Sequence, residues 1–166
     1  ARAAGEDLEL HVVNVKRVTE GAVVSDRPSL DRSELHHMID EVVRKAITEQ
    51  GVTQIVEIAC GLSPRGVRFC QEFPDLQYIE ADLPAMLAHK KRLLSEHGLL
   101  SKRHRVVGIN ILEENTPDAL AVVFKRELDP TRKTLVITEG LINYFDYATI
   151  SGFWKNLAQV DRKSVV

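Results

Sequence analysis

A loop of small residues and a downstream acid are the residues of this chain best suited to hold a ligand. The loop lies in segment 57–66, Glu-Ile-Ala-Cys-Gly-Leu-Ser-Pro-Arg-Gly, directly after the apolar pair 55–56. The acid, Asp82, ends a second apolar run that begins at Tyr78. Glycines at positions 61 and 66 let the backbone approach a ligand, and a carboxylate after the second strand can accept hydrogen bonds from ribose hydroxyls. The pattern therefore predicts a site for a nucleotide-type cofactor.

The elements that must position this site alternate along the chain. Apolar runs predict parallel strands over residues 54–59, 77–81, 104–109 and 133–138. Helical periodicity, bounded by capping residues, prolines and glycines, predicts helices over residues 31–49, 64–72, 83–98, 116–126 and 146–159. Four strands that alternate with helices favour an α/β fold with a doubly wound, mostly parallel, Rossmann-like sheet.

The domain organisation follows from where these patterns begin. Residues 29–166 are expected to form one cofactor-binding α/β domain. Residues 1–28 are predicted as an N-terminal arm of uncertain structure, in which Leu10 to Val15 alternate weakly and fit either a short strand or an extended segment. One domain is also what a chain of 166 residues is expected to form.

Composition narrows the class of protein. The formal net charge is −2 and the basic residues are dispersed, which argues against a nucleic-acid partner. No apolar run approaches the roughly 20 residues that span a bilayer, so no membrane association is expected. Two cysteines without metal-binding spacing, and no signal-peptide pattern in the first ten residues, favour a reducing, cytoplasmic location.

Four segments together make the chain resemble a known family. They are residues 55–66, residues 78–84 (Tyr-Ile-Glu-Ala-Asp-Leu-Pro), residues 106–112 and residues 135–144, the last of which contains Thr-Glu-Gly-Leu. The chain resembles the class I S-adenosylmethionine-dependent methyltransferases. Within them it is most similar to the leucine carboxyl methyltransferase family, which also contains polyketide O-methyltransferases. The resemblance implies the cofactor S-adenosylmethionine.

The resemblance also implies roles for the cofactor-binding residues. Glu57 and the backbone of Ala59, Cys60 and Gly61 would hold the methionine end of the cofactor, Asp82 would bind the ribose hydroxyls, and Asn110 and Ile111 would border the adenine. Glu80, two residues before Asp82, is the competing acid on the same strand. Arg32 is a further candidate for the cofactor carboxylate.

The acceptor side is less defined. Glu139 is expected near the methionine end or the acceptor, and Tyr144 would line the acceptor pocket of a small molecule or protein. A carboxylate acceptor needs no general base, whereas a hydroxyl acceptor is helped by one, for which Glu139, His36 and His37 are the candidates. His36 and Asp40 share a helix face, as paired metal ligands would, but without a third ligand a solvated or partner-facing helix is the preferred interpretation.

Three departures from the family pattern bear on these expectations. Asn110 stands where the family usually has aspartate, which predicts weaker cofactor binding. Ala59 replaces a glycine, so residue 59 is expected to adopt a conformation that a side chain with a Cβ allows. The family sheet has seven strands and the pattern here shows four, so we expect truncation after the fourth strand. Its uncovered edge would then promote a homodimer.

Two other functions compete with an O-methyltransferase. A non-catalytic or truncated methyltransferase-fold chain would act mainly through self-association. An NAD-binding domain is disfavoured because the spacing of Ala59, Gly61 and Gly66 does not give the G-x-G-x-x-G fingerprint.

Overall fold

The computed structural model describes residues 10–15, 32–141 and 144–160. The strands are β1 (Leu10–Val15), β2 (Gln54–Ile58), β3 (Gln77–Asp82), β4 (His104–Gly108) and β5 (Thr134–Glu139). The helices are α1 (Arg32–Gln50), α2 (Arg65–Glu72), α3 (Pro84–Glu96), α4 (Leu120–Glu127) and α5 (Tyr147–Val160). Most of the predicted arm, and the side chain of Arg32, lie outside the described residues.

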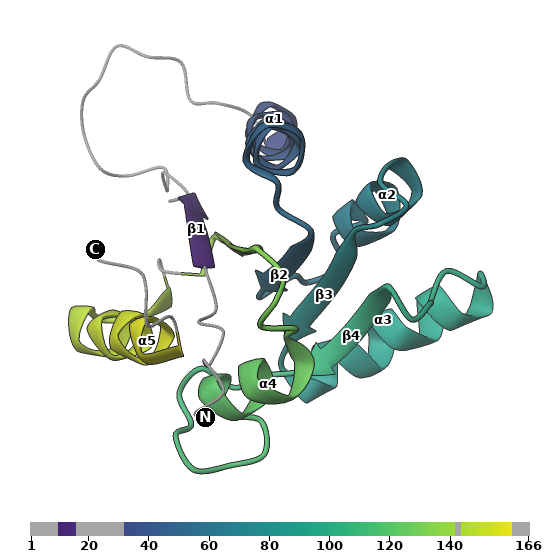
Figure 1. Ribbon diagram of the computed structural model, residues 1–166. Helices are drawn as coiled ribbons and strands as arrows, with labels where there is room; N and C mark the ends of the chain where they lie inside the picture. The colour runs from purple at the N-terminus through teal and green to yellow at the C-terminus, as the bar shows by residue number, and fades with distance from the viewer. Residues whose placement is uncertain (1–9, 16–31, 142–143, 161–166) are drawn as a thin grey trace, which may run out of the picture.

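The strands form one parallel sheet in the order β1-β5-β2-β3-β4 (Figure 1). The predicted α/β class is therefore confirmed, and the four predicted strands lie within one residue of their expected ends. Because β2 lies between β5 and β3, the chain changes direction across the sheet after β4. In open α/β sheets, ligands bind outside the carboxyl ends of the strands at such a switch point.

The expected uncovered edge on the fourth predicted strand is wrong. That strand is β5, and β1 pairs with it over its full length, from Leu10 opposite Thr134 to Val15 opposite Glu139. The sheet thus contains a fifth strand beyond the four predicted. His11 and Asn14 interrupt the apolar pattern of this strand. For this reason the sequence fitted either a short strand or an extended segment here.

The helix predicted from residue 116 begins later, at Leu120. Ala119 forms an isolated parallel bridge with Asn110 and has an extended backbone, so the helix cannot include it. Proline at position 117 also disfavours the helical conformation for Thr116.

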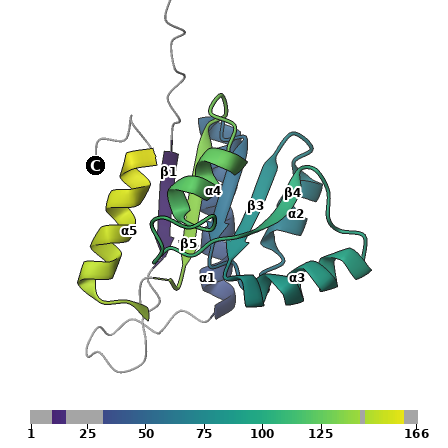
Figure 2. The same ribbon diagram turned by 90° about the horizontal axis from the view of Figure 1, so that it is seen from below.

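Helices cover both faces of the sheet (Figures 1 and 2). On one face, α1 and α2 pack against a cluster that includes Ile55, Tyr78 and Leu135. On the other, α4 and α5 pack against the alternate residues of the same strands, such as Val56 and Val136. Burying each aliphatic side chain contributes roughly 1.5–3 kcal/mol, so this two-sided core holds the strand ends in place. No helix in the described part of the chain is long and apolar enough to cross a membrane.

Candidate functional site

The glycine-containing loop and the predicted ribose-binding acid meet at the carboxyl edge of the sheet. The main-chain N–H of Gly61 donates a hydrogen bond of 2.7 Å to Oδ2 of Asp82, which ends β3. The main-chain N–H of Leu83 donates another of 2.7 Å to Oδ1. Each carboxylate oxygen has two lone pairs, so Asp82 can still accept hydrogen bonds from a ligand.

The loop after β2 takes a glycine-like path. Gly61 has a φ of 51°, and Ala59 has a φ of 58°, the one positive φ of a non-glycine residue within the described segments. The expectation that the Cβ keeps residue 59 out of this conformation is therefore wrong. The left-handed region costs a residue with a Cβ about 1–2 kcal/mol, and the surrounding bonds hold Ala59 there. Among them, the N–H of Cys60 donates to the carbonyl of Ala81 at 3.2 Å.

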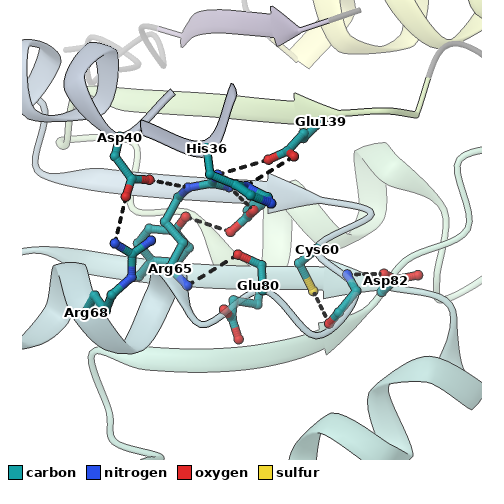
Figure 3. A network of polar contacts seen from close by, with 12 residues as sticks. His36, Asp40, Cys60, Arg65, Arg68, Glu80, Asp82 and Glu139 are labelled. Atoms are coloured by element: carbon teal, nitrogen blue, oxygen red, sulfur yellow. Dashed lines mark hydrogen bonds and ion pairs between the residues drawn. The ribbon is translucent and has the colours of Figure 1, made fainter. Parts of the chain in front are cut away.

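Arg65 is the centre of a buried ionic network that the sequence did not reveal (Figure 3). Its side chain is fully buried at the start of α2. Nε donates to Oδ1 of Asp40 at 2.8 Å, Nη2 to Oε2 of Glu139 at 2.9 Å, and Nη1 to Oε1 of Glu57. One guanidinium thus connects α1, β2 and β5. Arg65 lies within the loop segment that the sequence singles out. An arginine directly after a proline at the start of a helix has the pattern of a solvated residue, so its burial was not predicted.

Glu57 is held inside this network. Its side chain is only 2% exposed, and the hydroxyl of Tyr78 donates to Oε2 at 2.7 Å while Arg65 occupies Oε1. Burial raises the pKa of Glu57, although Arg65 and Tyr78 act in the opposite direction. Burial lowers the pKa of Arg65, but Glu57, Asp40 and Glu139 raise this pKa by more than burial lowers it. The guanidinium therefore stays charged. Both carboxylate oxygens of Glu57 are therefore engaged within the protein.

Glu139 is the more accessible acid of the network, with a side chain 20% exposed at the end of β5. Its Oε1 lies 3.3 Å from Nδ1 of His36, whose side chain is 40% exposed. The structure therefore brings two of the three predicted base candidates together. His37, the third, lies on the exposed side of α1.

Asp40 does not lie on a solvated helix face, and that expectation is wrong for this residue. The residue is 3% exposed, and Arg65 and Arg68 bind its two carboxylate oxygens. Because the carboxylate is buried and two arginines already pair with it, Asp40 is poorly suited to bind a metal cation. Within residues 10–15, 32–141 and 144–160, no cluster of three or more histidine, cysteine or acidic side chains is arranged to hold a metal ion.

Asn110 lies beside Asp82 at the carboxyl edge. The N–H of Ile109 donates to the Asp82 carbonyl at 3.0 Å, and Oδ1 of Asn110 accepts a 3.1 Å bond from the N–H of Leu112. Ile111 is half-buried and packs against the core cluster under α4. The predicted adenine-binding residues and the predicted ribose-binding acid thus come from neighbouring strand ends.

Three exposed leucines form a feature that the sequence interpretation missed. Leu62, Leu83 and Leu112 follow β2, β3 and β4, and are 52%, 53% and 57% exposed. Leu62 directly follows Gly61, Leu83 directly follows Asp82, and Leu112 lies two residues after Asn110. This proximity to the motif residues could have identified the leucines from the sequence. Apolar side chains at successive strand ends suit contact with a flat, weakly polar ring.

Tyr144 follows β5 in the chain and lies at the surface. It is 77% exposed, and the described contacts include none between its ring and Glu139. Cys60, by contrast, is 5% exposed within the loop, as expected of a small residue that fits there. Burial raises the pKa of its thiol to about 12, which keeps it from acting as a thiolate nucleophile.

A second buried ionic cluster lies beneath the loop. Glu80 is fully buried, with Oε1 3.0 Å from Nζ of Lys90 and Oε2 3.1 Å from Nε2 of His104. Lys90 and His104 are only 3% and 1% exposed, although lysine is mostly exposed in folded proteins and histidine is only intermediate in burial. Glu80 has no access to a ligand in solvent, which leaves Asp82 as the acid suited to a ribose.

Solved structures share this fold. The methyltransferase domain of bacterial CtHen1 matches with a TM-score of 0.57 and 14% identity, over 77% of this chain and 62% of that one. The structure described as PigF with SAH matches with a TM-score of 0.53 and 12% identity, over 76% of this chain and 34% of that one. At these identities the likeness concerns the Rossmann-like methyltransferase fold alone.

Proteins related in sequence identify the family of this chain, which the shared fold alone does not. A protein of Mycobacterium tuberculosis assigned as an S-adenosyl-L-methionine-dependent methyltransferase is 35% identical over 96 residues, which are 58% of this chain and 30% of the relative. One of Frankia alni with the same assignment is 30% identical over 144 residues, which are 86% of this chain and 45% of the relative. This chain therefore spans less than half the length of these relatives. The family model for leucine carboxyl methyltransferases matches residues 34–158, and the chain belongs to that family.

Proposed function

We propose that this chain forms the cofactor-binding part of an S-adenosylmethionine-dependent O-methyltransferase. The observation that carries the proposal is the 2.7 Å bond between the Gly61 N–H and Asp82, which places the glycine-containing loop against an acid at the switch point of the sheet. Membership of the leucine carboxyl methyltransferase family supports the same reaction class.

In this proposal each end of the cofactor has its own residues. Asp82 accepts hydrogen bonds from the ribose hydroxyls with the lone pairs that Gly61 and Leu83 leave free. Leu83 and Leu112 give the adenine an apolar surface, and the amide of Asn110 lies at its edge. The bound cofactor supplies a methyl group that its sulfonium activates for in-line displacement.

Electrostatics favour a cationic ligand beside Glu139. Three acidic side chains, those of Asp40, Glu57 and Glu139, share only two arginines, Arg65 and Arg68. Glu139 is the accessible acid among them. The ammonium and sulfonium groups of S-adenosylmethionine are both positive, and they would be attracted to this end of the sheet.

The acceptor atom is proposed to be an oxygen, of either a carboxylate or a hydroxyl. A carboxylate already has the lone pair that attacks the methyl carbon. A hydroxyl must lose a proton, and His36, oriented by the nearby Oε1 of Glu139, is the group suited to take it. Tyr144 is exposed and so is available to an acceptor.

Isothermal titration with S-adenosylmethionine and S-adenosylhomocysteine tests the proposal. We expect micromolar binding in the wild-type chain and its loss in Asp82→Ala, because the ribose would lose its acceptor. Asp75→Ala is the matched control, since Asp75 is an exposed acid just before β3. Absence of binding in a chain that circular dichroism shows to be folded would contradict the proposal. It would favour the competing function through self-association.

A further inference from the structure

Lys90 occupies a position where an apolar residue is expected. It lies on the buried face of α3 between Leu87 and Leu94, at the spacing that places all three on one side of the helix. These leucines belong to a small apolar cluster with Cys60 and Val106. A lysine in such surroundings is costly unless its charge is paired and its hydrogen bonds are made.

Two groups from different parts of the fold meet the Lys90 ammonium. Oε1 of Glu80, on β3, lies 3.0 Å from Nζ, and Nζ donates a 2.9 Å hydrogen bond to the main-chain carbonyl of Ser63. Ser63 lies in the glycine-containing loop, two residues before α2 begins. The ammonium therefore connects α3, β3 and the loop.

Charge pairing alone does not explain this arrangement. Well-packed apolar residues often stabilise a core as well as a buried ion pair does, or better. What apolar residues cannot supply is a donor for the Ser63 carbonyl. No other described contact of the Ser63 carbonyl is a hydrogen bond from a side chain, so Lys90 is what ties this part of the loop to the sheet.

We propose that Lys90 is a positioning residue that holds the loop in the conformation needed to bind the cofactor. The inference rests on the proposed function, because it assigns Lys90 an effect on cofactor affinity without contact to the cofactor. Lys90 fixes the loop at Ser63, and Asp82 fixes it at Gly61. Between these two points the backbone must present the groups that bind the methionine end.

A double variant separates positioning from charge neutralisation. Lys90→Met leaves Glu80 buried without the ammonium, so its thermal stability should fall. Glu80→Gln/Lys90→Met removes both charges, and most of the lost stability should return. The affinity for S-adenosylhomocysteine should nevertheless stay about tenfold weaker than in the wild-type chain, because Ser63 still lacks its donor. Lys91→Met is the matched control, since Lys91 is exposed on the same helix.

Amide hydrogen exchange without cofactor gives a second, independent measurement. The N–H groups of Gly61 and Ser63 are bonded to Asp82 and to the Cys60 carbonyl, so their exchange reports on the loop. We expect the N–H groups of Gly61 and Ser63 to exchange faster in the double variant than in the wild-type chain. In Lys91→Met their exchange should be unchanged. Unchanged exchange, or faster exchange with wild-type affinity, would overturn the inference. A wild-type chain that binds no S-adenosylhomocysteine would refute the proposed function, and the exchange would still decide whether Lys90 positions the loop.

Discussion

Gly66 and Glu80 approach each other so closely that a Cβ at position 66 would lie 2.6 Å from Oε1 of Glu80. The same Cβ would lie 2.7 Å from Nε2 of His104. Both neighbours are fully buried, and Oε2 of Glu80 lies 3.1 Å from Nε2 of His104, so neither side chain can move aside freely. The close approach of α2 to β3 therefore requires glycine at this position. From the sequence, Gly66 was instead expected to let the backbone approach a ligand.

Replacing Gly66 by alanine should destabilise the protein. Helix propensity alone would favour alanine by about 1 kcal/mol, but overpacking in a rigid core costs about 1–3 kcal/mol. We expect the steric term to prevail and the midpoint of urea unfolding to fall. Gly152→Ala in α5 is the control, because a Cβ there meets nothing within 4 Å, and it should be neutral or stabilising. Equal effects at both positions would contradict this packing.

Ala59→Gly should stabilise the protein, contrary to the usual effect of glycine. The left-handed backbone costs alanine about 1–2 kcal/mol, whereas glycine adds roughly 0.4–1 kcal/mol of unfolded-state entropy. The net gain should be about 0.5–1 kcal/mol by these terms, measured by chemical unfolding. Ala88→Gly, on the exposed side of α3, is the comparison and should lose about 1 kcal/mol. A loss of stability in Ala59→Gly would mean that residue 59 is not strained.

The contact between α1 and α2 should make stability depend on pH in the acid range. Nε and Nη2 of Arg44 donate to the two carboxylate oxygens of Glu72 at 2.7 and 2.9 Å, which lowers the pKa of Glu72 from its usual 4.5. A lowered pKa favours the folded state above the unfolded pKa, and the benefit disappears as the pH falls through the folded pKa.

Glu72→Gln should therefore be less stable than the wild-type chain at neutral pH, and the difference should shrink as the pH falls below the usual pKa of glutamate. The neutral-pH difference should be below about 1 kcal/mol, because both side chains are about two-fifths exposed and solvent screens the pair. Thermal unfolding at several pH values measures it, with Glu49→Gln as an exposed control on α1. A difference that persists unchanged in acid would show that the ion pair is not its source.

Most of the fold could be predicted from local sequence patterns, whereas the site could be predicted only in part. Apolar runs predict β2, β3 and β5 well because these strands are buried on both faces, as Ile55 and Val56 illustrate by packing into opposite clusters. The contact of Gly61 with Asp82 was also predictable, since adjacent parallel strands end at the same edge.

The buried ionic residues could not be predicted in this way. Arg65, Lys90 and His104 have the polarity of surface residues, and each is buried because partners distant in sequence neutralise it or complete its hydrogen bonds. Arg65 bonds to Glu139, 74 residues later in the chain, and Lys90 bonds to Ser63, 27 residues earlier. Periodicity within one element contains no information about such pairings.

The sheet order also constrains the sequence of events during synthesis. β1 and β2 each pair with β5, and β5 separates them, although 75 residues lie between β2 and β5 in the chain. A nascent chain can pair β2, β3 and β4 as they emerge, but β1 has no neighbour until Thr134–Glu139 has been made. Such long-range pairing is slow and leaves strand edges open in the meantime. Of the five described strands, the one synthesised first would thus be among the last to join the sheet.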